Sequence, residues 1–183
     1  LPGVAEINRM KMLLESTRAF SNSSRYRVCA LHSALPMNEQ QHAFEIPPKH
    51  VRKIILSTNV AETGVTIPDA VFVVDTCLVK ETRFDDASRM RSLVQCRVPQ
   101  SSAEQRRGRA GRVRNGFCFR LITKWEYDNE LSPELTPEIR RVPLTELVLG
   151  ILVSAANGSG HSGGHNIQSM EYLAMALDPP EPT

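Results

Sequence analysis

The chain has 183 residues, and its 22 Lys and Arg against 20 Asp and Glu give a formal net charge of +2. This length suits one full hydrophobic core, or one core with an appendage. A charge so close to zero excludes a global field that would attract nucleic acid, so any such binding must be local. No apolar run approaches the roughly 18 residues of a membrane helix, and no signal peptide is present, which predicts no membrane partner.

The cysteines and histidines indicate a compartment but no metal site. The sequence has 4 Cys, none in a C-x-x-C pair, which is typical of reduced thiols and of an intracellular protein. His161 and His165 are spaced like half of a zinc site, but no convincing second pair accompanies them. We therefore expect no metal ligands in this chain.

The first part of the chain alternates helical and strand patterns. Apolar residues at helical spacing predict an amphipathic helix over residues 4–19, and Pro36 opens a second helix that runs through Phe44. Compact apolar runs predict strands at 26–31, 53–57 and 71–75, the last two covered on both faces. Strands that alternate with helices predict an α/β fold with parallel βαβ units.

The second part contains one irregular stretch between regular elements. Residues 79–98 intersperse basic and apolar side chains, a pattern that predicts a protruding β-hairpin. A further strand at 117–122 and a helix at 144–153 follow it. The glycine-rich residues 157–165 predict a flexible linker, and the proline-rich end predicts a boundary with a following segment.

The most informative stretch is QRRGRAGR at 105–112. On a helix, Gln105, Arg109 and Arg112 are spaced i, i+4, i+7 and share one face, so two guanidinium forks and an amide point together. Such forks match phosphate oxygens, and an amide can orient a water molecule. Gly108 and Gly111 each cost roughly 1 kcal/mol within a helix, which indicates close approach to a neighbouring element. The alternative is a solvated basic face or a localisation signal, which accounts for neither the glycines nor the glutamine.

The loop at 57–67, STNVAETGVTI, directly follows a predicted buried strand. It would therefore lie at the carboxyl end of a parallel sheet, where α/β proteins bind ligands. Its hydroxyl groups and Gly64 suit contact with the phosphates of RNA or of a nucleotide. From the residues alone, an ordinary strand-to-helix loop with capping residues is an equally good interpretation.

Here the sequence resembles a known family. QRRGRAGR is similar to motif VI of the superfamily 2 helicases, in the form found in the DEAH/RHA group of ATP-dependent RNA helicases. The resemblance implies a RecA-like parallel sheet flanked by helices. It also implies that Gln105 positions the attacking water, and that Arg109 and Arg112 act as arginine fingers on the γ-phosphate.

The loop at 57–67 resembles motif V of the same family. The resemblance implies that Thr58 and Asn59 contact the RNA backbone, whereas the later residues face the nucleotide: Gly64, Thr66 and Asp69. Many family members carry a serine at the position of Gly64, so a backbone amide would have to serve there.

Three further segments carry the resemblance. The segment at 31–47 resembles motif IVa and its continuation, which implies that Ser33 binds RNA and that Phe44 stacks on the adenine. Phe44 alone would more often be a core residue. LPGVAEI at 1–7 resembles the end of motif IV and implies an RNA contact at Gly3. The predicted hairpin at 79–98 resembles a hairpin of the family that is thought to wedge against RNA. The resemblance implies RNA contacts through Arg83, Arg89 and Arg91.

The sequence lacks a G-x-x-x-x-G-K-[ST] phosphate loop and an Asp-Glu-x-His motif. We therefore expect the second RecA-like domain at 1–153, without its first strand, and at 154–183 a linker and the start of a winged-helix region. ATP would bind with Mg ligands from a first RecA-like domain, and an activating protein would be a further partner. The isolated chain would be inactive. The alternative is a non-catalytic RNA-binding or scaffold module that keeps the helicase fold.

Overall fold

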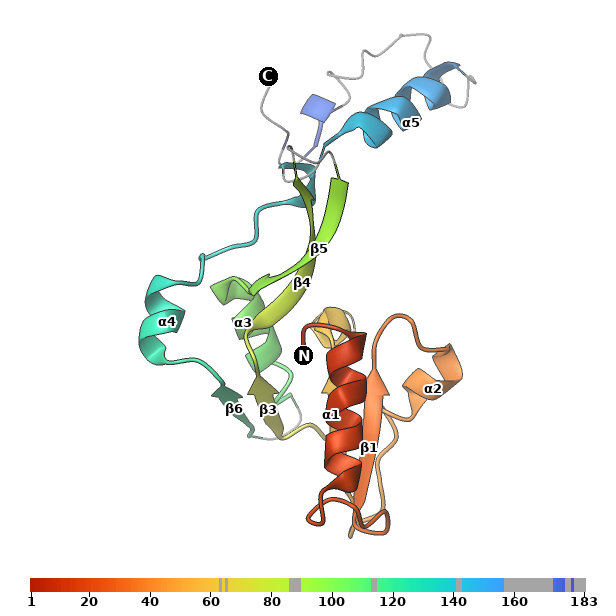
Figure 1. Cartoon of the computed structure of the whole chain (residues 1–183), viewed down its shortest axis with the longest axis vertical. Coiled ribbons are helices and arrows are strands. Elements are labelled where there is room, and N and C mark those ends of the chain that lie inside the picture. Colours follow the sequence, from red (N-terminus) through yellow and green to blue (C-terminus); the bar gives the residue numbers. More distant parts are fainter. Residues whose placement is uncertain are drawn as a thin grey trace. The chain divides into compact units, whose positions relative to one another are not determined.

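The structure is a computed structural model that describes residues 1–62, 64, 66–85, 90–112, 115–140, 143–156, 173–176 and 179. The chain divides into two compact units. The first contains Leu1–Glu81 and Val94–Leu135, and the second contains Thr82–Leu93 and Thr136–Thr183. Among the described residues the strands form three two-stranded sheets (Figure 1).

The first sheet joins β1 (Tyr26–Leu31) and β2 (Arg52–Ser57) in parallel, in register from Tyr26↔Arg52 to Leu31↔Ser57. Helix α1 (Val4–Ser16) packs against both strands, as Figure 1 shows for β1. It ends before the predicted residue 19, because the backbone of Thr17 is extended (φ −79°, ψ 124°), and the hydroxyl of Thr17 donates to the carbonyl of Leu13.

The second helix is also shorter than predicted. α2 (Met37–Gln41) follows Pro36 and does not reach Phe44. The N–H groups of Ala43 and Phe44 bond three residues back, to Gln40 and Gln41, so the chain tightens into turns. A buried cluster of Cys29, Leu31, Ala43 and Ile67 lies beneath, and Phe44 packs against it.

The second sheet joins β3 (Phe72–Asp75) and β6 (Phe117–Arg120) in parallel. The prediction that the strand at 71–75 is covered on both faces was wrong for β3, because alternate side chains of β3 are exposed. Phe72 and Val74 of β3 pair with Phe117 and Phe119 of β6, and these four side chains are 55–65% exposed. Asp75, the last residue of β3, is buried and pairs with Arg106.

The remaining elements contain the hairpin and the arginine segment. β4 (Leu78–Asp85) and β5 (Met90–Arg97) pair with each other, which confirms the predicted hairpin. The later elements are α3 (Gln100–Arg107), α4 (Lys124–Asn129) and α5 (Thr145–Ala156), with 3₁₀ turns η1 (Asn59–Ala61) and η2 (Glu138–Arg140). Helix α4 was not predicted. Thr123 and Glu126 cap it reciprocally, the T-x-x-E pattern of a helix start.

Candidate functional site

The arginine segment is not one continuous helix, so that prediction was wrong. Helix α3 ends at Arg107, and the N–H groups of Arg109 and Ala110 bond only three residues back. Gly111 then takes φ 86°, a left-handed conformation that favours glycine. Gln105 therefore lies in the last helical turn, whereas Arg109 and Arg112 lie in the turns that follow it.

Close approach of neighbouring backbone occurs in this segment, but at another glycine. A Cβ added to Gly116 would lie 2.6 Å from the backbone nitrogen of Gly111 and 2.8 Å from the carbonyl oxygen of Val71. Gly116 therefore seats the arginine turns against the start of β3. Gly108, by contrast, has a helical conformation at the end of α3.

The structure brings Arg112 to the loop that follows β2. Its Nη1 donates a 2.7 Å hydrogen bond to the hydroxyl of Thr66, and both side chains are exposed. Two residues predicted to face the nucleotide from separate motifs thus touch each other. Gly64 in the same loop is exposed at φ 75°, which explains a glycine there on conformational grounds.

Arg109 lies within the electrostatic influence of Arg112. Its Nε donates to the carbonyl of Gln105 at 3.3 Å, so the arginine folds back over the last turn of α3. Partial burial lowers the pKa of Arg109, the charge of Arg112 lowers it further, and Glu62 opposes both. Two guanidinium groups that repel each other favour an anion between them, and phosphate matches their hydrogen-bond geometry.

Arg106 has a different environment from its neighbours and makes a buried network. Its Nε donates to Glu62 at 3.0 Å, and its Nη1 donates to Asp75 at 2.9 Å and to the carbonyl of Leu78 at 3.2 Å. The side chains of Arg106, Glu62 and Asp75 are only 13%, 14% and 3% exposed. Sequence reasoning identified neither acid. A carboxylate at the end of a buried apolar strand was the available signal for Asp75.

Two residues predicted to bind the nucleotide, Phe44 and Asp69, are linked through Lys53. This nearly buried lysine lies 2.7 Å from a carboxylate oxygen of Asp69, and its Nζ donates to the carbonyls of Ala43 and Glu45 at 2.8 Å each. Lys53 therefore fixes the backbone on both sides of Phe44, which is half-buried. These contacts give Asp69 a structural role, and its predicted nucleotide contact stays a prediction.

The predicted RNA-binding residues of the first unit lie at one edge of the β1–β2 sheet. Ser33 and Thr58 follow the paired strand ends Leu31 and Ser57, and the N–H of Thr58 bonds to the carbonyl of Leu31 at 3.2 Å. The backbone nitrogen of Leu1 bonds to the carbonyl of Ser57 at 2.8 Å, which brings Gly3 to this edge. Asn59 is exposed beside them.

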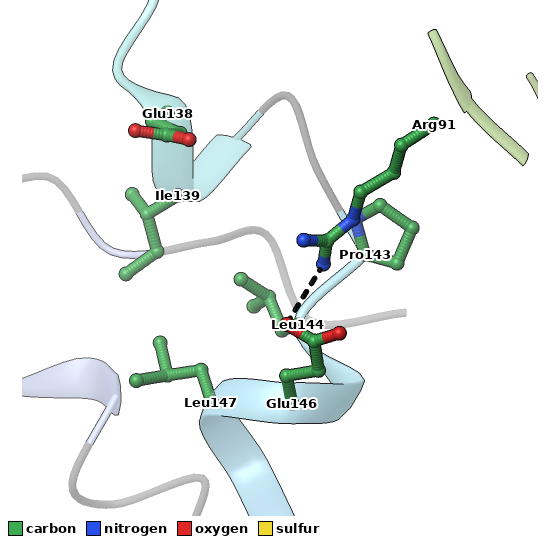
Figure 2. Close-up of a pocket in the computed structure, with 7 residues that line it drawn as sticks. All are labelled: Arg91, Glu138, Ile139, Pro143, Leu144, Glu146 and Leu147. Carbon is green, nitrogen blue, oxygen red and sulfur yellow. Dashed lines mark ion pairs between the residues drawn. The ribbon is translucent and has the colours of Figure 1, made fainter. Parts of the chain in front are cut away.

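The hairpin arginines have separate environments. Arg83 in β4 is exposed, and Arg89 lies outside the described residues. Arg91 in β5 lies 3.3 Å from Glu146, with both side chains exposed, so the ion pair contributes little to stability. Figure 2 shows this pair at a pocket whose apolar lining comes from four residues: Ile139, Pro143, Leu144 and Leu147.

Comparison with known proteins identifies the class. Residues 4–114 match the family described as the helicase conserved C-terminal domain. The chain is 50% identical over 181 residues to the ATP-dependent RNA helicase DHX29 of Mus musculus, covering 99% of the chain and 12% of that protein. It is 43% identical over 182 residues to the putative ATP-dependent RNA helicase DHX57 of Homo sapiens, with 98% and 13% covered.

A solved structure gives the same result. The chain is similar to the Escherichia coli DEAH/RHA helicase HrpB, with a TM-score of 0.75 and 37% identity over 83% of this chain and 19% of that one. The chain belongs to the helicase conserved C-terminal domain family. Within it, the chain is the C-terminal RecA-like domain of a DEAH/RHA superfamily 2 helicase, as the resemblance implied. It spans about an eighth of the length of the curated relatives it matches.

Two further predictions concern membranes and metals. In the described part of the chain, no helix has both the length and the apolar character to cross a membrane. Within the same residues, no group of three or more His, Cys, Asp or Glu side chains is arranged to hold a metal ion. The predicted supply of Mg ligands by a first RecA-like domain stays a prediction.

Proposed function

We propose that this chain completes the ATP site of a partner RecA-like domain and grips single-stranded RNA, so that ATP hydrolysis drives unwinding or remodelling of RNA. The observation that carries the proposal is the contact between Arg112 and Thr66. Arg109 lies within range of electrostatic repulsion by Arg112, and partial burial and this repulsion both lower the pKa of Arg109. This arrangement presents two cations and a hydroxyl on one exposed surface.

The residues of this surface have separate roles in ATP binding and hydrolysis. Gln105 orients the attacking water, and Arg109 and Arg112 stabilise the charge that develops on the γ-phosphate. Phe44 stacks on the base, and Lys53 holds the backbone around it. Mg would offset the charge of the phosphates, and its ligands would come from the first RecA-like domain. The chain has no phosphate loop of its own, so its isolated form has no ATPase activity.

The RNA is gripped at the edge formed by the ends of β1 and β2. Ser33, Thr58 and Asn59 offer hydroxyl and amide groups there, which suit phosphate and sugar oxygens. Gly3 lies near the same strand ends, where a Cβ would meet the paired side chains of Glu6 and Lys80. Closure of the two RecA-like domains on ATP then moves this edge relative to the RNA contacts of the other domain.

The wider organisation follows the same proposal. Residues 1–153 belong to the second RecA-like domain, whereas the linker and the start of a winged-helix region expected at 154–183 lie largely outside the described residues. The partners are the first RecA-like domain of the same polypeptide, the following winged-helix region, RNA and an activating protein. The helicases named among the relatives support ATP and RNA as ligands.

The experiment compares two neighbouring arginines in the helicase that carries this domain. Arg112→Ala should lower RNA-stimulated ATP hydrolysis by about 10³-fold or more, because an arginine finger acts mainly in the transition state. Arg107→Ala is the matched control, since Arg107 is 63% exposed and its ion pair is with Glu104 in its own helix. Equal, small losses for both variants would contradict the proposal.

A further inference from the structure

The feature that the proposed function does not use is the buried network around Arg106. One guanidinium group joins three separate parts of the chain: Glu62 in the loop after β2, Asp75 at the end of β3, and the carbonyl of Leu78, where β4 begins. Each contact is 3.2 Å or shorter. Because a guanidinium presents its donors in a rigid fork, lysine could not make the same set of contacts.

The network fixes the turn that starts the hairpin. Oδ1 of Asp75 accepts from Arg106 at 2.9 Å and also from the backbone N–H of Cys77 at 2.9 Å. Cys77 has φ 54°, a conformation that a residue with a Cβ seldom takes. The turn at 75–78 is therefore held in an unfavourable conformation by side-chain contacts, and Arg106 supplies two of them.

Arg106 also lies next to the residues proposed to act on ATP. It directly follows Gln105 in α3, and Arg109 begins the turns after that helix. A displacement of α3 in response to the nucleotide would therefore be transmitted to Glu62 and to the first residue of β4. The exposed neighbour Arg107 instead pairs with Glu104 within α3 itself.

We infer that Arg106 is a positioning residue that couples the nucleotide-facing arginines to the hairpin, so that hydrolysis produces strand separation. This inference rests on the proposed function. Arg106 touches neither ATP nor RNA in this account. Its loss should uncouple the two activities rather than abolish hydrolysis.

The test uses the complete helicase with RNA duplex, and measures ATP hydrolysed and duplex separated in the same reaction. Arg106→Lys keeps the charge but loses the fork, and should lower the duplex separated per ATP by about tenfold. Hydrolysis at saturating RNA should stay within about threefold of the parent. Arg107→Lys, the matched control, should change neither quantity.

A second variant keeps the inference testable if Arg106→Lys does not fold, as judged by thermal melting. Glu62→Gln retains an acceptor for Arg106 but removes its charge, and should lower the same ratio without lowering the RNA-independent rate. A parallel fall of hydrolysis and separation, or an unchanged ratio in the folded variants, would overturn the inference. If Arg112→Ala abolishes hydrolysis but the Arg106→Lys and Glu62→Gln variants keep the parent's ratio of duplex separated to ATP hydrolysed, only this inference fails. If hydrolysis survives in Arg112→Ala, the proposed function itself is contradicted.

Discussion

Arg112 donates a 2.7 Å hydrogen bond to the hydroxyl of Thr66, a residue 46 positions earlier in the chain. The contact joins the arginine turns to the loop that leaves β2. It gives the exposed guanidinium group a defined position before any phosphate arrives, and preorganised donors are effective in phosphoryl transfer.

Thr66→Val should therefore lower kcat/KM for ATP hydrolysis by about three- to tenfold, the effect of one hydrogen bond at an exposed site. Thr66→Ser should restore most of the loss because it keeps the hydroxyl. The double variant with Arg112→Ala decides whether Thr66 acts through the arginine, since it should then be no worse than Arg112→Ala alone. Additive losses would show that Thr66 acts independently.

Cys77 allows a test of backbone strain. It is completely buried against Val98 and Ala103, and burial raises the pKa of its thiol to about 11. Because its φ is 54°, Cys77→Gly should be within about 0.5 kcal/mol of Cys77→Ala in stability, since relief of strain offsets the lost methyl group.

The matched position is Cys29, which is also buried but lies in the regular strand β1. There, Cys29→Gly should be about 1 kcal/mol less stable than Cys29→Ala. Chemical denaturation of the four variants measures both differences. The same glycine penalty at both positions would contradict the left-handed conformation of Cys77.

The strands were the best predicted part of the fold because each carries a compact apolar run. β1 has the predicted bounds, and β2 and β3 differ from theirs by one residue. The helix through Arg112 was predicted from the spacing of charged groups, which says little about where a helix ends. The helix ends at Arg107, the chain continues in turns, and Gly111 then takes a left-handed conformation next to Gly116.

The proximity of Arg112 and Thr66 follows from two recognisable local segments that the fold brings together. The partners of Arg106 were missed because they lie 44 and 31 residues away, in contacts that no local spacing reveals. The roles of all the candidate residues, Arg112 and Thr66 included, stay predictions.

Glu104 predicts how stability depends on pH. Desolvation raises the pKa of Glu104, but hydrogen bonds from Arg120 and Tyr127 and the charge of Arg107 outweigh it, so the pKa lies below the ordinary 4.5. A lowered carboxyl pKa stabilises the folded state above the unfolded value, and this contribution is lost as the pH falls through the folded value.

The free energy of unfolding of Glu104→Gln should therefore be lower than that of the parent at pH 7, and the difference should shrink below about pH 4.5. Denaturant titrations between pH 3 and 7 measure this difference. Tyr127→Phe removes one of the hydrogen bonds to Glu104 and should reduce the pH dependence only in part. A difference that is constant with pH would mean that the carboxylate charge is not responsible.

The exposed apolar face of the β3–β6 sheet predicts association of the isolated chain. Val74 and Phe119 pair across this sheet and are 65% and 55% exposed. Exposed apolar surface of this kind promotes contact between molecules. Threonine at both positions keeps β propensity and should reduce association in light scattering, whereas Met12→Thr on α1 should not. Equal effects would indicate a general change in solubility.

The central claim is that the arginine turns act on the nucleotide, whereas the edge of β1 and β2 and the hairpin act on RNA. The most direct measurement records RNA affinity against salt concentration, and ATP hydrolysis, for two sets of variants of the complete helicase. Arg109→Ala should lower hydrolysis by about 10³-fold or more and leave RNA affinity and its salt dependence nearly unchanged. Thr58→Ala, and alanine at Arg83, Arg89 and Arg91, should weaken RNA binding and, for the arginines, flatten the salt dependence, while basal hydrolysis survives. If Arg109→Ala weakened RNA binding as much as the hairpin variants while hydrolysis persisted, the arginine turns would be a nucleic-acid surface and the claim would be contradicted.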